Sequence, residues 1–203
     1  MEKFAFFFDS NKKYDVNPSD CLELSCGYGK LYANTHNQFN KYVGVDFSKL
    51  KIGLFRKNFP GVELICDNVV DYRPKQKLDI IHSNQLVQYL TKNQIKELIR
   101  WNIKFCSKGG IIIHRNIPDT KLLSLYFSGY LKPNLNTNKV TRVYYPLLYR
   151  FYSAIKSMIG SFSTFGFWYT ADEILSICNE LGVEGEIYGS ILYRYRFNLV
   201  IRL

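Results

Sequence analysis

The chain has 203 residues, of which 47% are hydrophobic, 16% aromatic and 22% charged. This length and this hydrophobic content fit one folded domain with a sizeable core, and they exclude a disulfide-held miniprotein and an intrinsically disordered chain. The 27 Lys and Arg residues against 17 Asp and Glu give a net charge of +10, which indicates an anionic ligand or surface partner.

Five cysteines occur without any C-x-x-C pair, so the sequence predicts neither a metal site nor a disulfide framework. The apolar run at residues 4–8 is too short for the core of a signal peptide. The most hydrophobic region, residues 143–169, is interrupted by Pro146, Arg150 and Lys156, which argues against a membrane span. We therefore expect a cytoplasmic protein.

From residue 21 onward, short apolar runs alternate with longer helical patterns, which is typical of parallel strands joined by crossover helices. The five runs expected as strands before residue 120 are 21–25, 42–46, 62–66, 78–83 and 110–114. Between the last two, Thr91 can cap a helix that the glycines at 109 and 110 would end.

The C-terminal part predicts one more helix and two more strands. Thr170 and Glu173 form a capping box for a helix that reaches Leu181 and stops at Gly182. Two strand-like runs follow, at residues 184–189 and 196–203, and the short connection between them favours an antiparallel hairpin.

Residues 120–169 do not follow this alternation and are expected to be an insertion over one end of the sheet. From residue 120 to 171 there are six basic residues and no acidic one, mixed with many tyrosines. One interpretation is a packed lid with solvated lysines. The others are a lid that grips a phosphate-bearing small substrate and a groove for single-stranded nucleic acid.

The first strand runs into the sequence Glu23-Leu-Ser-Cys-Gly-Tyr-Gly29. Alternate glycines after a buried strand allow a sharp turn and bring backbone N–H groups close to a ligand. A dinucleotide fingerprint would need a third glycine where Tyr32 stands, which weakens an NAD hypothesis.

Two acidic residues end the next two strands. Asp46 stands where a carboxylate can accept both hydroxyls of a ribose, and Asp67 where one can accept from an exocyclic amine such as that of adenine. Because the carboxyl ends of parallel strands form the ligand crevice of an open sheet, these acids with Glu23 predict a nucleoside site there.

At these residues the sequence resembles the class I S-adenosylmethionine-dependent methyltransferases. The segments that carry the resemblance are 23–29, 44–48, 67–68, 78–90, 108–114 and 168–173. The resemblance spans residues 21–203 apart from the insertion. It implies a Rossmann-like, seven-stranded, mostly parallel sheet with helices on both faces and a final antiparallel hairpin, and we expect one α/β domain over residues 1–203. The insertion at 120–169 interrupts the resemblance, and we expect it to act as a substrate lid.

The resemblance also implies S-adenosylmethionine as the cofactor, S-adenosylhomocysteine as the product, and no metal. The residues that it assigns to the cofactor are Glu23, Ser25, Gly27, Gly29, Asp46, Phe47, Asp67, Asn68 and Ser83. Ser25 departs from the family, which usually has glycine at that position, and the N-terminal segment before the motif is short.

Gln85 and His114 are the candidates for catalysis. His114 ends the predicted fifth strand, where it would face the crevice as the base that takes a proton from the acceptor, and a structural histidine at a strand end is the alternative. The candidate substrate-binding residues are Arg115, Arg142, Tyr144, Tyr145 and Arg150.

We thus expect methyl transfer to an oxygen, or secondarily to a nitrogen, of a small or saccharide-linked, anionic and potentially phosphorylated acceptor. In general pattern the chain is similar to small methyltransferases of polysaccharide and secondary-metabolite biosynthesis. The alternatives are an RNA methyltransferase and a catalytically silent subunit that binds cofactor and uses the insertion to hold a partner protein.

Overall fold

The computed structural model describes residues 19–127, 166–190 and 193–203. Its centre is a seven-stranded sheet in the order β3-β2-β1-β4-β5-β7-β6. The strands are β1 (Ser19–Leu24), β2 (Phe39–Asp46), β3 (Glu63–Cys66), β4 (Leu78–Asn84), β5 (Cys106–Pro118), β6 (Gly185–Gly189) and β7 (Arg196–Arg202). The first five strands are parallel, and β7 is antiparallel to both β5 and β6. This confirms the predicted fold.

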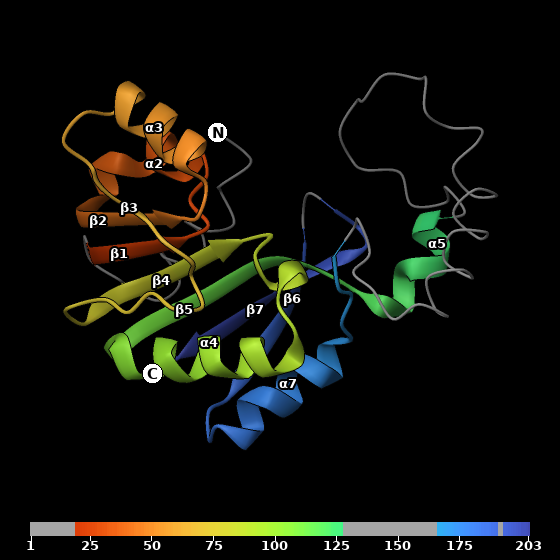
Figure 1. Cartoon of the computed structure of the whole chain (residues 1–203). Coiled ribbons are helices and arrows are strands. Elements are labelled where there is room, and N and C mark those ends of the chain that lie inside the picture. The colour runs from red at the N-terminus through yellow and green to blue at the C-terminus, as the bar shows by residue number, and fades with distance from the viewer. Residues whose placement is uncertain (1–18, 128–165, 191–192) are drawn as a thin grey trace.

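Helices cover both faces of the sheet (Figure 1). The α-helices are α2 (Lys30–Thr35), α3 (Lys49–Asn58), α4 (Lys92–Phe105), α5 (Leu123–Phe127) and α7 (Ala171–Glu180), and the 3₁₀ helices are η1 (His36–Gln38), η2 (Val87–Tyr89) and η3 (Thr120–Leu122). Both predicted capping boxes are present, at Thr91 with Gln94 and at Thr170 with Glu173.

The core is divided by the sheet into two hydrophobic clusters. One joins α2 and α3 to the face that carries Cys21, Ile80 and Ile113. The other joins α4 and α7 to the face that carries Leu22, Ile81 and Ile112. Side chains alternate between faces along a strand, so neighbouring residues of one strand serve different clusters.

The fifth strand is longer than the sequence predicts. It begins at Cys106, which we expected in the preceding helix, and it continues to Pro118 because β7 extends the ladder beyond the end of β4. The ladder with β7 shifts register between His114 and Ile117. His114 therefore lies inside β5, and the prediction that it ends the strand is wrong.

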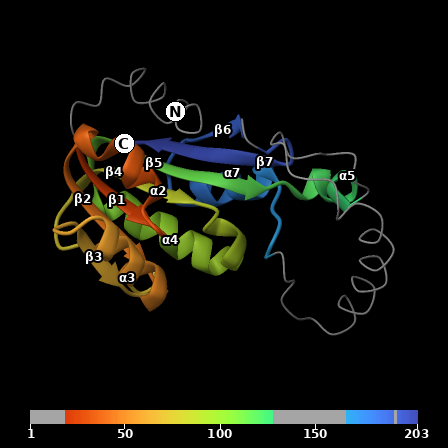
Figure 2. The ribbon, with the colours of Figure 1, turned by 90° about the horizontal axis from the view of Figure 1, so that it is seen from above.

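The chain segments just before and just after the insertion meet at one point beside β5. Asp119 and Tyr169 form a bridge, Tyr169 N donates to Pro118 O at 3.1 Å, and Thr120 N donates to Tyr169 O at 3.1 Å. The described part that follows β5 is η3 and α5, which continue away from the carboxyl end of β5 in both views (Figures 1 and 2). Within the described residues, no helix is both long enough and apolar enough to cross a membrane.

Candidate functional site

The loop after β1 has an unusual backbone. Ser25, Gly27 and Gly29 have positive φ angles of 60°, 58° and 77°. A Cβ at Gly29 would lie 2.5 Å from the ring of Phe55, whereas a Cβ at Gly27 would meet nothing within 4 Å. Gly29 is thus required by packing, and Gly27 leaves open space beside the backbone into which a ligand can fit.

Asp46 ties this loop to the end of β2. Its carboxylate accepts from Gly27 N at 3.0 Å and from Ser48 N at 2.9 Å. The carboxylate is buried, and each oxygen that accepts one hydrogen bond keeps capacity for another. The next residue, Phe47, is 75% exposed, so its apolar ring is open to solvent.

Asp67 and Asn68 follow β3 and are exposed. Asp67 accepts from Asn68 N at 2.7 Å, and Asn68 accepts from Val70 N at 3.1 Å while its amide donates to Asp71 at 3.0 Å. Asp67 N also donates to Asp46 O at 3.3 Å. The acidic residues at the ends of β2 and β3 are therefore neighbours, as the sequence predicts.

Glu23 lies in the interior. Tyr42 Oη donates to its carboxylate, and His82 Nδ1 lies 3.7 Å from it. Burial raises the pKa of Glu23 to about 8, while the Tyr42 hydrogen bond opposes this shift. These contacts hold Glu23 behind the loop, and its contact with a cofactor stays a prediction.

The candidate base His114 does not face the crevice. It is fully buried, with Nδ1 2.8 Å from Ser83 Oγ and Nε2 3.1 Å from Asn102 Nδ2. Burial lowers the pKa of His114 to about 3, so the ring is neutral. The prediction that His114 faces the crevice is wrong, because its side of β5 packs against α4.

Gln85 and Arg115 lie where β4 ends. Gln85 has a φ of 58°, is half-buried, and donates its N–H to Arg115 O at 2.9 Å. The guanidinium of Arg115 is buried and makes no hydrogen bond to any described residue. The remaining substrate candidates, Arg142, Tyr144, Tyr145 and Arg150, lie outside the described residues.

Asn116 was missed by the sequence analysis. It has a φ of 60°, is buried, and occupies the register shift of β5. Its four hydrogen-bond partners come from three segments, namely β4, the residue after β6, and β7: Asn84 Oδ1 at 2.7 Å, Ser190 Oγ at 2.6 Å, Asn198 Oδ1 at 3.0 Å and Arg196 Nη1 at 2.6 Å. No sequence pattern predicts that these residues meet. The one local hint of the unusual backbone at residue 116 is the residue type, because asparagine tolerates a positive φ.

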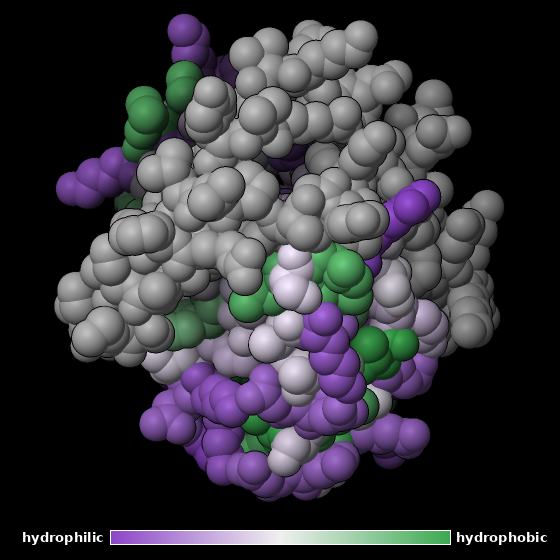
Figure 3. Space-filling model, turned by 90° about the vertical axis from the view of Figure 1, so that its right-hand side faces the viewer, coloured by the Kyte–Doolittle hydropathy of each residue, from purple (hydrophilic) through white to green (hydrophobic). Residues whose placement is uncertain are grey.

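An aromatic cluster lies at the start of β7. It consists of Tyr126, Trp168, Tyr193 and Tyr195, with ring centroids 4.4 to 5.8 Å apart. Arg196 lies 5.1 Å from the ring of Tyr195 and 5.4 Å from that of Tyr193, and it also donates to Gln88 at 2.9 Å. Figure 3 shows the side of the molecule on which α5 lies in Figure 1, where hydrophobic and hydrophilic side chains lie next to each other.

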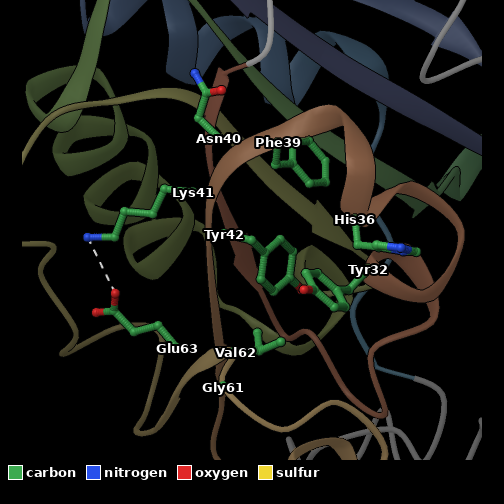
Figure 4. A pocket seen from close by; sticks show the side chains of 9 residues that line it. All are labelled: Tyr32, His36, Phe39, Asn40, Lys41, Tyr42, Gly61, Val62 and Glu63. Carbon is green, nitrogen blue, oxygen red and sulfur yellow. Dashed lines mark ion pairs between the residues drawn. The ribbon is translucent and has the colours of Figure 1, made fainter.

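A cavity of about 300 Å³ lies at the opposite end of the sheet (Figure 4). It is lined by Tyr32, His36, Phe39, Asn40, Lys41, Tyr42, Gly61, Val62 and Glu63, with an ion pair of 3.3 Å between Lys41 and Glu63. These residues surround the amino ends of β2 and β3. The cavity is therefore separate from the carboxyl ends of β1, β2 and β4, where Gly27, Asp46 and Gln85 lie.

Positive φ angles occur at the carboxyl-terminal parts of three strands. The three non-glycine residues with positive φ in the described chain are Ser25, Gln85 and Asn116, at the carboxyl-terminal parts of β1, β4 and β5. Such strain gathers at ligand sites because the surrounding structure must enforce it. Among the described residues, no group of three or more His, Cys, Asp or Glu side chains is placed to hold a metal.

Comparison with known proteins agrees with this geometry. Residues 21–110 match the family model described as a methyltransferase domain. Phosphoethanolamine N-methyltransferase 3 of Arabidopsis thaliana is 23% identical over 109 residues, which are 49% of this chain and 22% of that protein. The chain thus spans about a fifth of the length of that relative.

Solved structures share the fold over nearly the whole chain. A methyltransferase from Clostridium acetobutylicum has a TM-score of 0.70 at 13% identity and covers 99% of this chain and 90% of its own. An amino pentose methyltransferase from Micromonospora echinaspora has a TM-score of 0.72 at 13% identity with the same coverage. A sugar N-methyltransferase from Streptoalloteichus has a TM-score of 0.71 at 10% identity and covers 98% and 86%.

Proposed function

The chain belongs to the class I S-adenosylmethionine-dependent methyltransferases, and from this premise we propose that it transfers a methyl group from S-adenosylmethionine to a nitrogen of a small, anionic acceptor. The observation that carries the proposal is the hydrogen bond that joins the glycine loop after β1 to Asp46 at the end of β2. There, the Asp46 carboxylate holds Gly27 N at 3.0 Å and the open side of Gly27 faces no other atom within 4 Å.

The residues present fit this cofactor. Asp46 retains acceptor capacity for the ribose hydroxyls, exposed Asp67 and Asn68 suit the adenine edge, and exposed Phe47 suits its ring. When bound, S-adenosylmethionine supplies a methyl group activated by a sulfonium. The residues of this chain bind the two molecules, orient the acceptor and exclude water, which is where most of the rate enhancement of a direct displacement comes from.

The choice of nitrogen follows from the position of His114. A hydroxyl is a poor nucleophile unless a base takes its proton, whereas a neutral amine attacks with its lone pair and can release its proton afterwards. His114 is neutral, buried and hydrogen-bonded through both ring nitrogens, so it is not placed to be that base. The relatives named as sugar and phosphoethanolamine N-methyltransferases agree with this choice.

The acceptor would bind between Gln85 and the aromatic cluster. Tyr193 and Tyr195 can stack on a sugar or another flat ring, and Arg196 and Arg115 supply positive charge. The lid role of residues 120–169 and the anionic acceptor, predicted from the sequence, belong to this proposal. Biosynthesis of surface polysaccharides or secondary metabolites is the setting that such an acceptor suggests.

Titration calorimetry with S-adenosylhomocysteine tests the cofactor site. Asp46→Asn should weaken binding at least 10-fold, about 1.4 kcal/mol, because a neutral amide accepts weakly from ribose hydroxyls. Asp79→Asn is the matched control, since that carboxylate accepts from Asp20 N at 3.0 Å at the other end of the sheet. A wild-type chain that binds no S-adenosylhomocysteine would refute the proposal.

The acceptor class is tested with methyl-labelled S-adenosylmethionine and paired acceptors that differ only in one group. Amino sugars and phosphoethanolamine should take label, whereas the corresponding hydroxyl compounds should not. Labelling of the hydroxyl compounds alone would restore oxygen as the acceptor atom. A short RNA serves as a third arm, and its labelling in preference to both would favour the RNA alternative.

A further inference from the structure

We propose that Arg115 is an anion-binding residue of the crevice, where its guanidinium takes a carboxylate or phosphate group. This inference rests on the proposed function, because it names the charge of a group that would be held at that same site. It concerns a side chain that has no hydrogen-bond partner among residues 19–127, 166–190 and 193–203.

The burial of Arg115 is not matched by hydrogen bonds. Its side chain belongs to a residue that is 5% exposed, and Nε is buried without a hydrogen-bond partner. The described residues form no hydrogen bond or ion pair with either terminal nitrogen. Leaving an N–H group of a guanidinium buried and unsatisfied is costly, so proteins normally surround a guanidinium with acceptors. The missing acceptor points to a ligand.

Glu23 does not supply this acceptor. Glu23 is paired with His82, and His82 with Ile113, so these side chains lie on one face of the sheet. Arg115 follows Ile113 by two residues and lies on that face, closer to the strand ends. The two charges influence each other through space, yet no ion pair forms between them. With its pKa raised to about 8, the Glu23 carboxyl is mainly neutral at pH 7, and Tyr42 Oη already binds it.

The position of Arg115 connects it to the crevice. Its carbonyl accepts from Gln85 N at 2.9 Å, and it stands opposite Asn84 in the ladder between β4 and β5. The next residue is Asn116, whose hydrogen bonds join β4, Ser190 and β7. A guanidinium at this place is a planar donor that can bind both oxygens of a carboxylate or phosphate.

Two bound molecules could present that anion. One is the cofactor, through the carboxylate of its amino-acid part, and the other is the acceptor, through a carboxylate or phosphate. The chemistry is the same in both cases. Ligands that carry or lack the amino-acid part distinguish them.

The test uses the full chain with Arg115→Gln, which removes the charge, and Arg115→Lys, which keeps the charge without the planar fork. Arg100→Gln is the matched control, because Arg100 is exposed on α4 and pairs with Glu97. The probes are S-adenosylhomocysteine, methylthioadenosine, which lacks the amino-acid part, and inorganic phosphate added to the protein saturated with S-adenosylhomocysteine.

If the cofactor supplies the anion, Arg115→Gln should bind S-adenosylhomocysteine at least 10-fold more weakly and methylthioadenosine with unchanged affinity. If the acceptor supplies it, S-adenosylhomocysteine affinity should stay unchanged and phosphate binding should disappear. Arg115→Lys should weaken the same probe to a smaller extent. Unchanged binding of all three probes by Arg115→Gln would overturn the proposal.

Thermal unfolding separates binding from a structural role. Without ligand, Arg115→Gln should unfold at the wild-type temperature or above it, since the variant removes an unpaired buried charge. A lower unfolding temperature in both Arg115 variants, with every affinity preserved, would show that Arg115 only supports the fold. Binding of phosphate by a wild-type chain that ignores S-adenosylhomocysteine would refute the proposed function and leave the anion site standing.

Discussion

The crevice has two sides that are built in different ways. Around β1 and β2, the contacting groups are backbone N–H groups and short side chains from two stretches, residues 23–29 and 46–48, joined by Asp46. Around β4, β5 and β7, asparagine, histidine and serine side chains from distant segments hold one another, with Asn116 and His114 at the centres.

This difference predicts which substitutions destabilise each side. The β1–β2 side depends on backbone conformation and close packing, so a substitution that enlarges a side chain should destabilise it. The β4–β5–β7 side depends on satisfied buried polar groups, so it is sensitive to the removal of a partner. A shared nucleoside cofactor needs one constant shape, whereas an acceptor site must differ between enzymes, and the proposed function assigns the two sides accordingly.

The largest expected effect is on the β1–β2 side. Gly29→Ala should lower the free energy of unfolding by about 3 kcal/mol or more, because the new Cβ would lie 2.5 Å from Phe55 and the φ of 77° is unfavourable for alanine. Gly27→Ala is the matched variant, with a φ of 58° and no atom within 4 Å, and should cost about 1 kcal/mol. Urea unfolding measures both. Equal losses would mean that packing does not distinguish the glycines.

On the other side, Asn116→Ala should destabilise the protein by about 2 to 3 kcal/mol, because it removes the side-chain hydrogen bonds to Asn84 and Ser190 and because alanine adopts a positive φ poorly. Asn116→Gly keeps the conformation and should cost about 1 kcal/mol less. S-adenosylhomocysteine affinity should be preserved in both variants. A loss of that affinity without a loss of stability would contradict the separation of the two sides.

The two sides should also respond to pH in opposite directions. The pKa of His114 falls from 6.5 to about 3 on folding, so its contribution is present above pH 6.5 and is lost on acidification, by about 2 kcal/mol between pH 7 and 5. The pKa of Glu23 rises from 4.5 to about 8, so its contribution is present below pH 4.5 and is lost, to a similar extent of about 2 kcal/mol, as pH rises from 5 to 7.

In the wild type, the contributions of His114 and Glu23 oppose each other between pH 5 and 7, and His82 adds to that of His114 because burial lowers its pKa. Glu23→Gln should therefore increase the loss of stability on acidification. His114→Gln should shift the profile toward the loss with rising pH that Glu23 causes. Denaturant unfolding at several pH values checks the signs, and identical pH profiles for both variants would contradict these pKa shifts.

The smallest expected effect is a gain. Ser25→Gly should stabilise the protein by about 1 kcal/mol, since glycine adopts the φ of 60° without strain. Ser107→Gly, in β5, is the control and should lose about 0.5 to 1 kcal/mol, because glycine weakens a strand. If Ser25→Gly is more stable and binds S-adenosylhomocysteine less tightly, the strain at Ser25 serves binding.

Much of the β1–β2 side could be predicted from the sequence. The glycines, Asp46, Asp67 and the order of strands and helices all follow from patterns within a few residues, and the structure brings the acidic residues to one edge. The failure at His114 has a physical cause. The sequence shows where apolar runs begin, yet the end of β5 depends on β7, where Pro118 pairs with Arg196.

The sequence by itself determined the parallel sheet, the terminal hairpin and the glycine loop, because periodicity, capping and turn residues act over one or two turns of chain. Only the tertiary structure decided that His114 faces α4, that Asn116 joins β4 to β7, and that Arg115 is buried with no acceptor among the described residues. Those properties depend on which face of a strand is covered and on which distant groups can satisfy its polar atoms, and both are set by packing across the whole sheet.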